Sequence, residues 1–302
     1  MRRRALAPLA LAALALLAGC DDEVPVPEDI AAYFTLWGAL DPTTDQQAIR
    51  VVPIVPVSSE GGPGASPDVE ATVTSTDLQT GETVTWRDSV VTFSNGTTGH
   101  VFVAGFRPAY DRFYRVEVVR DDGATTTATL QTPPSVQPAR QPTQYPLGDV
   151  LMAVYWPGAP QLNDIEVVYT LEDGDCEVFD YVVPFAGDAE PFEFGWVTTI
   201  HLPAESQRVL GLLGNRPHAV RRMEVRAEVA SEDWRPPGGV FDPEVLVEPG
   251  TFTNVERGFG LVGGAYPAEI SWEPESVALL RTAFETPGFG SCAQGGSGSA
   301  GR

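Results

Sequence analysis

The feature that most limits the fold is a series of short, alternating apolar runs before residue 133, each ended by residues that favour turns. The runs cover residues 33–40, 48–57, 69–76, 82–87, 90–93, 100–104, 113–120 and 125–131. Thr80-Gly81, Asn95-Gly96 and Asp122-Gly123 separate several of them, and Asp-Gly is typical of a tight β-hairpin. Short strands at this spacing predict an immunoglobulin-like or fibronectin-III-like β-sandwich over residues 30–133.

Two details refine this prediction. Pro53 and Pro56 lack the N–H that a central strand needs, so we expect their strand at a sheet edge. Phe106-x-Pro108 followed by Tyr114 and alternating valines resembles a tyrosine corner, in which the tyrosine hydroxyl binds the preceding loop. Tyr114 is therefore expected to be structural.

A proline-rich segment at 134–148 predicts a linker, and strand patterns resume after it. We expect a second β-rich, sandwich-like domain over 149–285 and a flexible Gly/Ser tail over 286–302. Two short helices are predicted within it, one from Pro203 to Gly214 and one from Pro274, with Val277, Leu280 and Phe284 on one face. The expected strands are 149–156, 165–171, 177–184, 192–202, 220–230, 245–247, 259–262 and 268–272.

The N-terminus resembles a lipoprotein export signal. Three arginines at 2–4 precede an Ala/Leu run over 5–17, which is too short to span a bilayer, and the run ends in Leu17-Ala18-Gly19-Cys20. This order resembles the bacterial lipobox, which implies cleavage after residue 19 and lipidation of Cys20; the alternative is an ordinary signal peptide. Residues 20–29 would form an acidic tether, and several acyl chains would anchor the protein stably.

The acidic Asp21-Asp22-Glu23 leaves the destination open. It resembles an inner-membrane retention signal in some bacteria and a surface-export signal in others. We expect the cell envelope, and the outer membrane within it, with the face undetermined.

Charge argues against several functions. The whole chain has a net charge of −22, and all 19 of its basic residues are arginine. Without residues 1–19, 16 basic residues stand against 41 acidic ones, a net charge of −25. Nucleic-acid binding is disfavoured because it needs a basic face, and P-loop or Schiff-base chemistry is excluded because both use lysine.

The cysteines suggest one disulfide bond, and an acidic loop offers a candidate calcium site. With Cys20 lipidated in an oxidising compartment, Cys176 and Cys292 are left to form a disulfide. Asp173 and Asp175 alternate in an acidic loop, which suits calcium, although the spacing is not that of an EF-hand and a plain acidic hairpin is the preferred interpretation. We expect no other cofactor.

Catalytic motifs are absent or weak. Gly258-x-Gly260-x-x-Gly263 matches the dinucleotide fingerprint, yet no βαβ pattern surrounds it, so close backbone packing is the preferred interpretation. His100, His201 and His218 form no metal motif, and no G-x-S-x-G elbow occurs. The many carboxylates leave a glycosidase pair open as an alternative.

Tryptophans beside turns offer a binding hypothesis. Trp156 precedes Pro-Gly, and Trp234-Arg235 precedes Pro-Pro-Gly-Gly, so their rings could stack on a sugar or peptide; packing beneath the loops is the alternative. Trp37, Trp86, Trp196 and Trp272 lie in strand patterns and are expected in the core.

Four stretches together resemble a family of bacterial lipoproteins. They are YFTLWGALDPTTDQQAIRVVPI, VEATVTSTDLQTGETVTW, FYRVEVVRDDGATTTATLQTP and FTNVERGFGLVGGAYP, within residues 34–272. The family is the domain of unknown function number forty-two forty-nine, typical of Bacteroidota. The resemblance implies an N-terminal β-sandwich, a second β-rich part and a setting rich in TonB-dependent receptors, and it brings no catalytic residues.

The sequence therefore predicts a lipid-anchored envelope protein that binds or scaffolds. A TonB-dependent uptake receptor or another envelope protein is the expected partner, besides the membrane itself. A carbohydrate-active hydrolase and a structural or adhesive surface protein remain alternatives.

Overall fold

The computed structural model describes residues 32–54, 69–92, 98–185, 189–214, 216–235, 252–284 and 286. The expectations for the signal peptide, Cys20, the tether, Pro56, the strand at 245–247 and Cys292 lie outside these residues. The described residues all belong to one compact unit. Among the described residues, no helix has both the length and the apolar character needed to cross a membrane.

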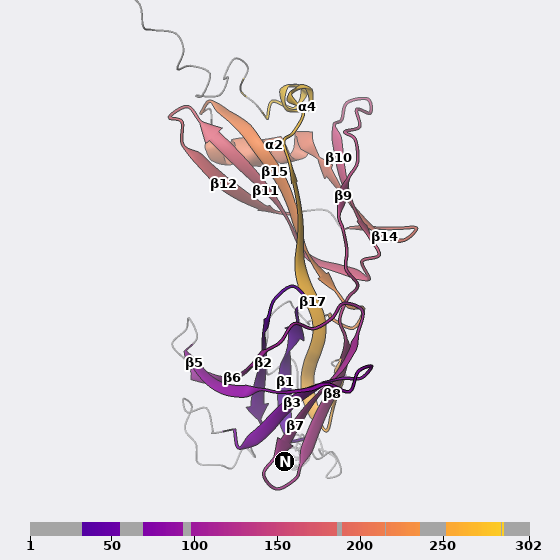
Figure 1. Cartoon of the computed structure of the whole chain (residues 1–302). Helices are drawn as coiled ribbons and strands as arrows, with labels where there is room; N and C mark the ends of the chain where they lie inside the picture. Colours follow the sequence, from indigo (N-terminus) through magenta and orange to yellow (C-terminus); the bar gives the residue numbers. More distant parts are fainter. Residues whose placement is uncertain are drawn as a thin grey trace, which may run out of the picture. The chain divides into compact units, whose positions relative to one another are not determined.

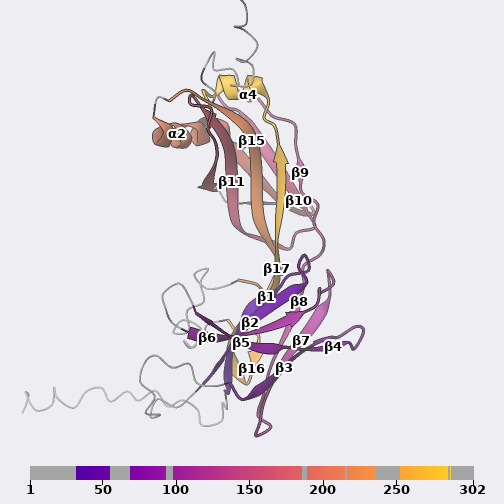
Figure 2. The same cartoon turned by 60° about the vertical axis from the view of Figure 1, so that its left-hand side comes forward.

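The predicted all-β sandwich fold is confirmed, together with its two short helices (Figures 1 and 2). The strands of the first half are β1 (Phe34–Leu40), β2 (Gln46–Pro53), β3 (Ala71–Asp77), β4 (Thr83–Thr85), β5 (Arg87–Thr92), β6 (Thr98–Gly105), β7 (Phe113–Arg120) and β8 (Thr125–Gln131). The later strands are β9 (Ala139–Arg140), β10 (Leu151–Pro157), β11 (Gln161–Asp173), β12 (Val178–Pro184), β13 (Glu190–Phe192), β14 (Gly195–His201), β15 (His218–Ala230), β16 (Val255–Glu256) and β17 (Gly258–Trp272).

These strands form three sheets. The first has eight strands in the order β12-β11-β15-β17-β1-β2-β6-β5. The second has the order β13-β14-β10-β9, and the third has the order β16-β8-β7-β3-β4. Elements from both halves of the sequence therefore share one sheet.

The joining element is β17, which Figure 1 shows as one continuous strand. Its first half, 258–264, pairs in parallel with β1, and its second half, 265–272, pairs antiparallel with β15. The sequence predicted two separate strands here, 259–262 and 268–272, because Gly264, Ala265, Tyr266 and Pro267 indicated a turn and a new strand. That prediction is wrong: beyond Gly264 β17 pairs with β15 alone, and a proline is tolerated where one side of a strand is free.

The glycines of β17 allow backbones to approach closely. A Cβ at Gly260 would lie 1.9 Å from the carbonyl oxygen of Leu36, and one at Gly264 would lie 2.4 Å from that of Gln131. Gly258-x-Gly260-x-x-Gly263 therefore lies within a strand and allows close backbone packing, which is the interpretation preferred from the sequence. A dinucleotide-binding site is excluded here because β17 continues to Trp272 and no helix directly follows the glycines in this described stretch.

The first core lies between the sandwich sheets and includes Phe34, Leu36, Ile49, Trp86, Phe102, Val116 and Val118. The predicted tyrosine corner is confirmed: the backbone N–H of Ala109 donates to the hydroxyl of Tyr114 at 2.9 Å. This bond fixes the loop before β7 while the alternate valines of that strand enter the core.

The predicted edge position of the Pro53 strand is wrong. β2 lies between β1 and β6, and Pro53 is its last residue. Pairing with β6 ends at Arg50, whereas Pro53 lies opposite Phe34 of β1. The proline therefore occupies a part of β2 that needs hydrogen bonds on one side only.

The second core gathers residues from β10, β11, β14, β15 and both helices. Helix α2 (Leu202–Leu213) begins with Pro203 in its first turn and ends at Gly214, whose φ is +65°, as predicted.

Helix α4 (Ser276–Arg281) differs from its prediction. Ala278 and Leu279 face the core, whereas Val277 and Leu280 are 56% and 54% exposed. Phe284 is buried as expected, but by another route: the helix ends at Arg281, and Ala283, with a φ of +55°, turns the chain. The predicted face assumed a helix that continues to residue 284.

Candidate functional site

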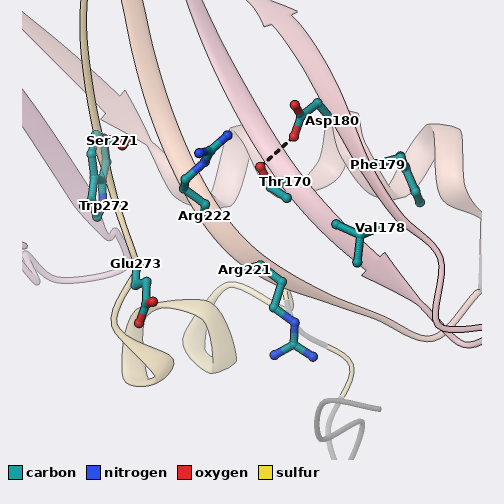
Figure 3. A pocket seen from close by; sticks show the side chains of 9 residues that line it. All are labelled: Thr170, Val178, Phe179, Asp180, Arg221, Arg222, Ser271, Trp272 and Glu273. Carbon is teal, nitrogen blue, oxygen red and sulfur yellow. Dashed lines mark hydrogen bonds between the residues drawn. The ribbon is translucent and has the colours of Figure 1, made fainter. Parts of the chain in front are cut away.

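The candidate site is an open hollow of about 670 Å³ on the outer face of the eight-stranded sheet. Its lining comes from four neighbouring strands and the residue after β17, as Figure 3 shows. The lining residues are Thr170, Val178, Phe179, Asp180, Arg221, Arg222, Ser271, Trp272 and Glu273. A volume of this size suits a small ligand.

Strand register places the polar side chains on one face. Thr170 of β11 pairs with Asp180 of β12 on one side and with Arg222 of β15 on the other. Their neighbours Tyr169 and Leu171 are fully buried in the second core. Since side chains alternate along a strand, Asp180, Thr170 and Arg222 form a row across the outer face.

A β-bulge brings a second arginine to this region. Thr170 pairs with Arg222 and Leu171 with Val220, so Arg221 is the extra residue of β15. The guanidinium of Arg221 forms an ion pair with Glu172 of β11. The bulge thus places two successive arginines along the lining of the hollow.

The two arginines differ in how far their charge is neutralised. Arg221 is held by Glu172, whereas Arg222 reaches only Glu224, with Nη2 3.7 Å from Oε2. Glu224 accepts a short hydrogen bond from Nε of Arg226, and this bond is the largest cause of the raised pKa of Arg226. Among the described residues, Arg222 therefore has as its ion-pair partner only the carboxylate of Glu224, which already accepts a hydrogen bond from Arg226.

The acidic groups of the hollow are also incompletely paired. Thr170 Oγ1 donates a hydrogen bond of 2.6 Å to Oδ1 of Asp180, which Figure 3 marks. Within the described part of the chain, neither Asp180 nor Glu273 lies within 4.0 Å of a basic group. The hollow thus offers one guanidinium and two carboxylates with spare hydrogen-bonding capacity.

Trp156, proposed as a ligand-stacking residue, is wrong for that role. It is fully buried, and its indole N–H donates to Thr198 Oγ1 at 3.0 Å. β10 alternates buried and partly exposed residues, and Trp156 falls on its buried side despite the turn that follows. No ring face remains for a surface ligand.

Trp234 is also buried, at 6% exposure, so the stacking hypothesis fails for it as well. Its indole N–H donates a hydrogen bond to Oε1 of Glu228 at 3.0 Å. The centre of its ring lies 5.3 Å from the centre of the Trp37 ring. Arg235 is exposed, and its Nε donates to Gln161 Oε1 at 2.9 Å. Trp234 therefore packs against Trp37, Leu261 and Ala265, whereas the Pro-Pro-Gly-Gly segment that follows it lies outside the described residues.

The acidic loop after β11 uses Asp173 for its own turn. Oδ1 of Asp173 accepts the backbone N–H groups of Asp175 at 2.9 Å and Glu177 at 3.1 Å. Among the described residues, no group of three or more His, Cys, Asp or Glu side chains is placed to hold a metal ion. Cys176 is disulfide-bonded, and the pairing with Cys292 stays a prediction.

The histidines lie apart, each with its own partner. His100 pairs with Asp88 at 2.7 Å, His201 with Asp149 at 2.9 Å, and His218 Nδ1 with the carbonyl of Arg216 at 2.8 Å.

One buried carboxyl group outside the hollow has a raised pKa. Burial raises the pKa of Glu205, against the lowering effects of Arg208 and Tyr169. Glu205 accepts hydrogen bonds from both of these residues. It is thus built into a packed network on α2 rather than into a cleft.

The hollow was not predicted from the sequence, although the sequence of β15 contains one sign of it. In the strand sequence AVRRMEV, Arg221 and Arg222 interrupt the alternation of apolar and polar residues. Two successive charged residues break the alternation of a strand, and a β-bulge is one arrangement that turns both side chains to one face. The partner residues on β11 and β12 could not be assigned without the register.

The comparisons with known proteins give no family. No protein-family model matches the chain, and no curated protein is similar to it in sequence. Among solved structures, a pullulanase from Anoxybacillus sp. LM18-11 is 11% identical over 66% of this chain, with a TM-score of 0.21; the match spans 24% of the pullulanase. Bovine butyrophilin is 11% identical over 80% of this chain and 99% of its own, with a TM-score of 0.20. Neither similarity bears on the fold or the function.

Proposed function

We propose that the protein is anchored in the bacterial cell envelope by lipid on Cys20 and acts there by binding. The outer membrane is the proposed location. The order of the arginines, the apolar run and Leu17-Ala18-Gly19-Cys20 supports the anchor.

The observation that carries the binding role is the hollow itself. Arg222 and Asp180 present charges that the described residues leave incompletely paired, on rigid strands and open to solvent. Paired strands hold side chains in fixed positions, which favours recognition of a ligand.

The proposed partner is another component of the envelope. The narrower proposal is that the protein is an accessory subunit of a TonB-dependent uptake receptor. The resemblance to the lipoprotein family supports this narrower form. Of the alternatives, an adhesive surface role would expose the β-domains to proteases added to intact cells, whereas a periplasmic role would protect them.

The anchor is tested by metabolic labelling with an alkyne analogue of palmitate. The wild-type chain should be labelled and should sediment with membranes, and Cys20→Ser should lose both properties. Cys176→Ser is the matched control and should keep its label. Label on Cys20→Ser, or a wild-type chain found in the soluble fraction, would refute the anchor.

The receptor proposal needs its own experiment. Cross-linking in intact cells, followed by purification of the tagged protein, should recover a TonB-dependent receptor with the wild type and not with Cys20→Ser. Recovery of equal amounts with both chains, or of no receptor, would rule out the accessory role while leaving the anchor intact.

A further inference from the structure

We propose that the hollow on the outer face of β11, β12, β15 and β17 binds a zwitterion, namely an α-amino acid or a short peptide with free ends. This inference rests on the proposed binding function and names its ligand class. Arg222 would hold the carboxylate, and Asp180 would hold the ammonium group.

Arg222 is suited to a carboxylate. Its side chain is 47% exposed, and no described residue accepts a hydrogen bond from its guanidinium. A guanidinium carries five N–H donors in a planar fork that matches a carboxylate in bidentate geometry. Because Arg226 already occupies Glu224, a ligand would face little competition for these donors.

Asp180 is suited to an ammonium group. One of its oxygens accepts the hydroxyl of Thr170, and this bond holds the carboxylate above β11. A carboxylate can accept about four hydrogen bonds, so capacity remains for a donor from outside the protein.

The spacing between the two groups favours a ligand that carries both charges. Asp180 and Arg222 lie on either side of Thr170, and adjacent strands are about 4.8 Å apart, so their backbones are roughly 10 Å apart. The two side chains do not form an ion pair with each other. Figure 3 shows the guanidinium of Arg222 between Trp272 on one side and Thr170 and Asp180 on the other.

Charge around the hollow disfavours simpler ligands. A plain anion at Arg222 would also meet Glu224, whose Oε2 lies 3.7 Å from the guanidinium, in a chain with a net charge of −22. A plain cation at Asp180 would meet Arg222. A dipolar ligand satisfies both groups without adding net charge.

The test measures binding to the full-length chain in detergent micelles by isothermal titration calorimetry. The probes are alanyl-alanine, its C-terminal amide, its N-acetyl derivative and free alanine. Alanyl-alanine should bind at least tenfold more tightly than either blocked form, and the relative affinity of free alanine tells an amino-acid site from a peptide site.

Variants assign the two roles. Arg222→Gln should weaken binding of alanyl-alanine at least tenfold and remove the discrimination against the amide. Asp180→Asn should instead remove the discrimination against the N-acetyl form. Arg115→Gln changes an exposed arginine of β7, outside the hollow, and should leave binding unchanged.

Three results would overturn the proposal: no heat of binding at 10 mM of any probe, equal affinity for the blocked and free dipeptides, or wild-type affinity in Arg222→Gln. None of them would affect the palmitate label on Cys20. Failure of the ligand assignment is therefore distinct from failure of the envelope proposal.

Discussion

The ring of Trp234 lies directly against Gly263. A Cβ on Gly263 would come within 2.5 Å of Cε3 of Trp234, and Gly263 is the residue of β17 that pairs with Ala39 of β1. With Leu261 and Ala265, Trp234 forms a small cluster where β17 passes from one pairing partner to the other.

Replacement of Trp234 should therefore destabilise the fold. Trp234→Ala removes a buried ring and its hydrogen bond to Glu228, and the expected loss is about 3–5 kcal/mol in the free energy of unfolding. Urea denaturation followed by circular dichroism measures it. A loss below about 1 kcal/mol would show that the ring is not tightly packed.

Gly263→Ala tests the same contact from the other side. Overpacking should cost about 1–3 kcal/mol, because the added methyl meets the ring and Cβ of Trp234. Gly211→Ala is the control: it lies within α2 with open space around it, so it should stabilise the protein by up to about 1 kcal/mol.

The tyrosine corner predicts a smaller effect. Tyr114→Phe removes the hydroxyl that accepts the N–H of Ala109, and the expected cost is about 0.5–1.5 kcal/mol. Tyr110→Phe, at a half-exposed position without such a bond, should be close to neutral. Equal stability of the two variants would argue against a structural role for the corner.

Asp77 should contribute to acid sensitivity. Burial alone would raise its pKa, but N–H groups of Gln79 and Thr80 and the charge of Arg112 outweigh burial, so the pKa of Asp77 is lowered. A lowered folded-state pKa stabilises the fold above the usual value of 3.8, and this contribution is lost as pH falls below it. Asp77→Asn should flatten the fall in stability between about pH 4 and pH 2, measured as the urea midpoint; an unchanged slope would contradict the assignment.

The disulfide of Cys176 should stabilise the second half of the chain. Peptide mapping without reduction is expected to find Cys176 linked to Cys292, and Cys176→Ser should cost about 2–4 kcal/mol. Detection of a Cys20 to Cys176 peptide instead would contradict both the pairing and the lipidation of Cys20.

The pattern of apolar, polar and turn-forming residues predicted much of the fold, because strands and turns depend mainly on residues that are neighbours in the sequence. The alternation around Val116 and Val118, the corner at Tyr114 and the end of α2 at Gly214 each depend on a few positions, and each was predicted correctly. The pairing of Phe34 with Gly258 depends on residues far apart in the chain, so no local pattern indicates it.

The candidate site was harder to predict for the same reason. Asp180, Thr170 and Arg222 come together through the registers of two strand pairs, which no single segment determines. The tryptophans beside turns suggested a site instead, because a turn residue is normally near the surface. Trp156 lies next to a turn, but it is buried because its side chain falls on the inward-facing side of β10.

The continuity of β17 has a consequence for how the protein unfolds. Because one strand contributes to the packing of both cores, loss of its pairing with β1 would also release the end of its pairing with β15. The residues 32–286 should therefore melt in a single cooperative transition, and amide protons on both sides of β17 should exchange with similar protection.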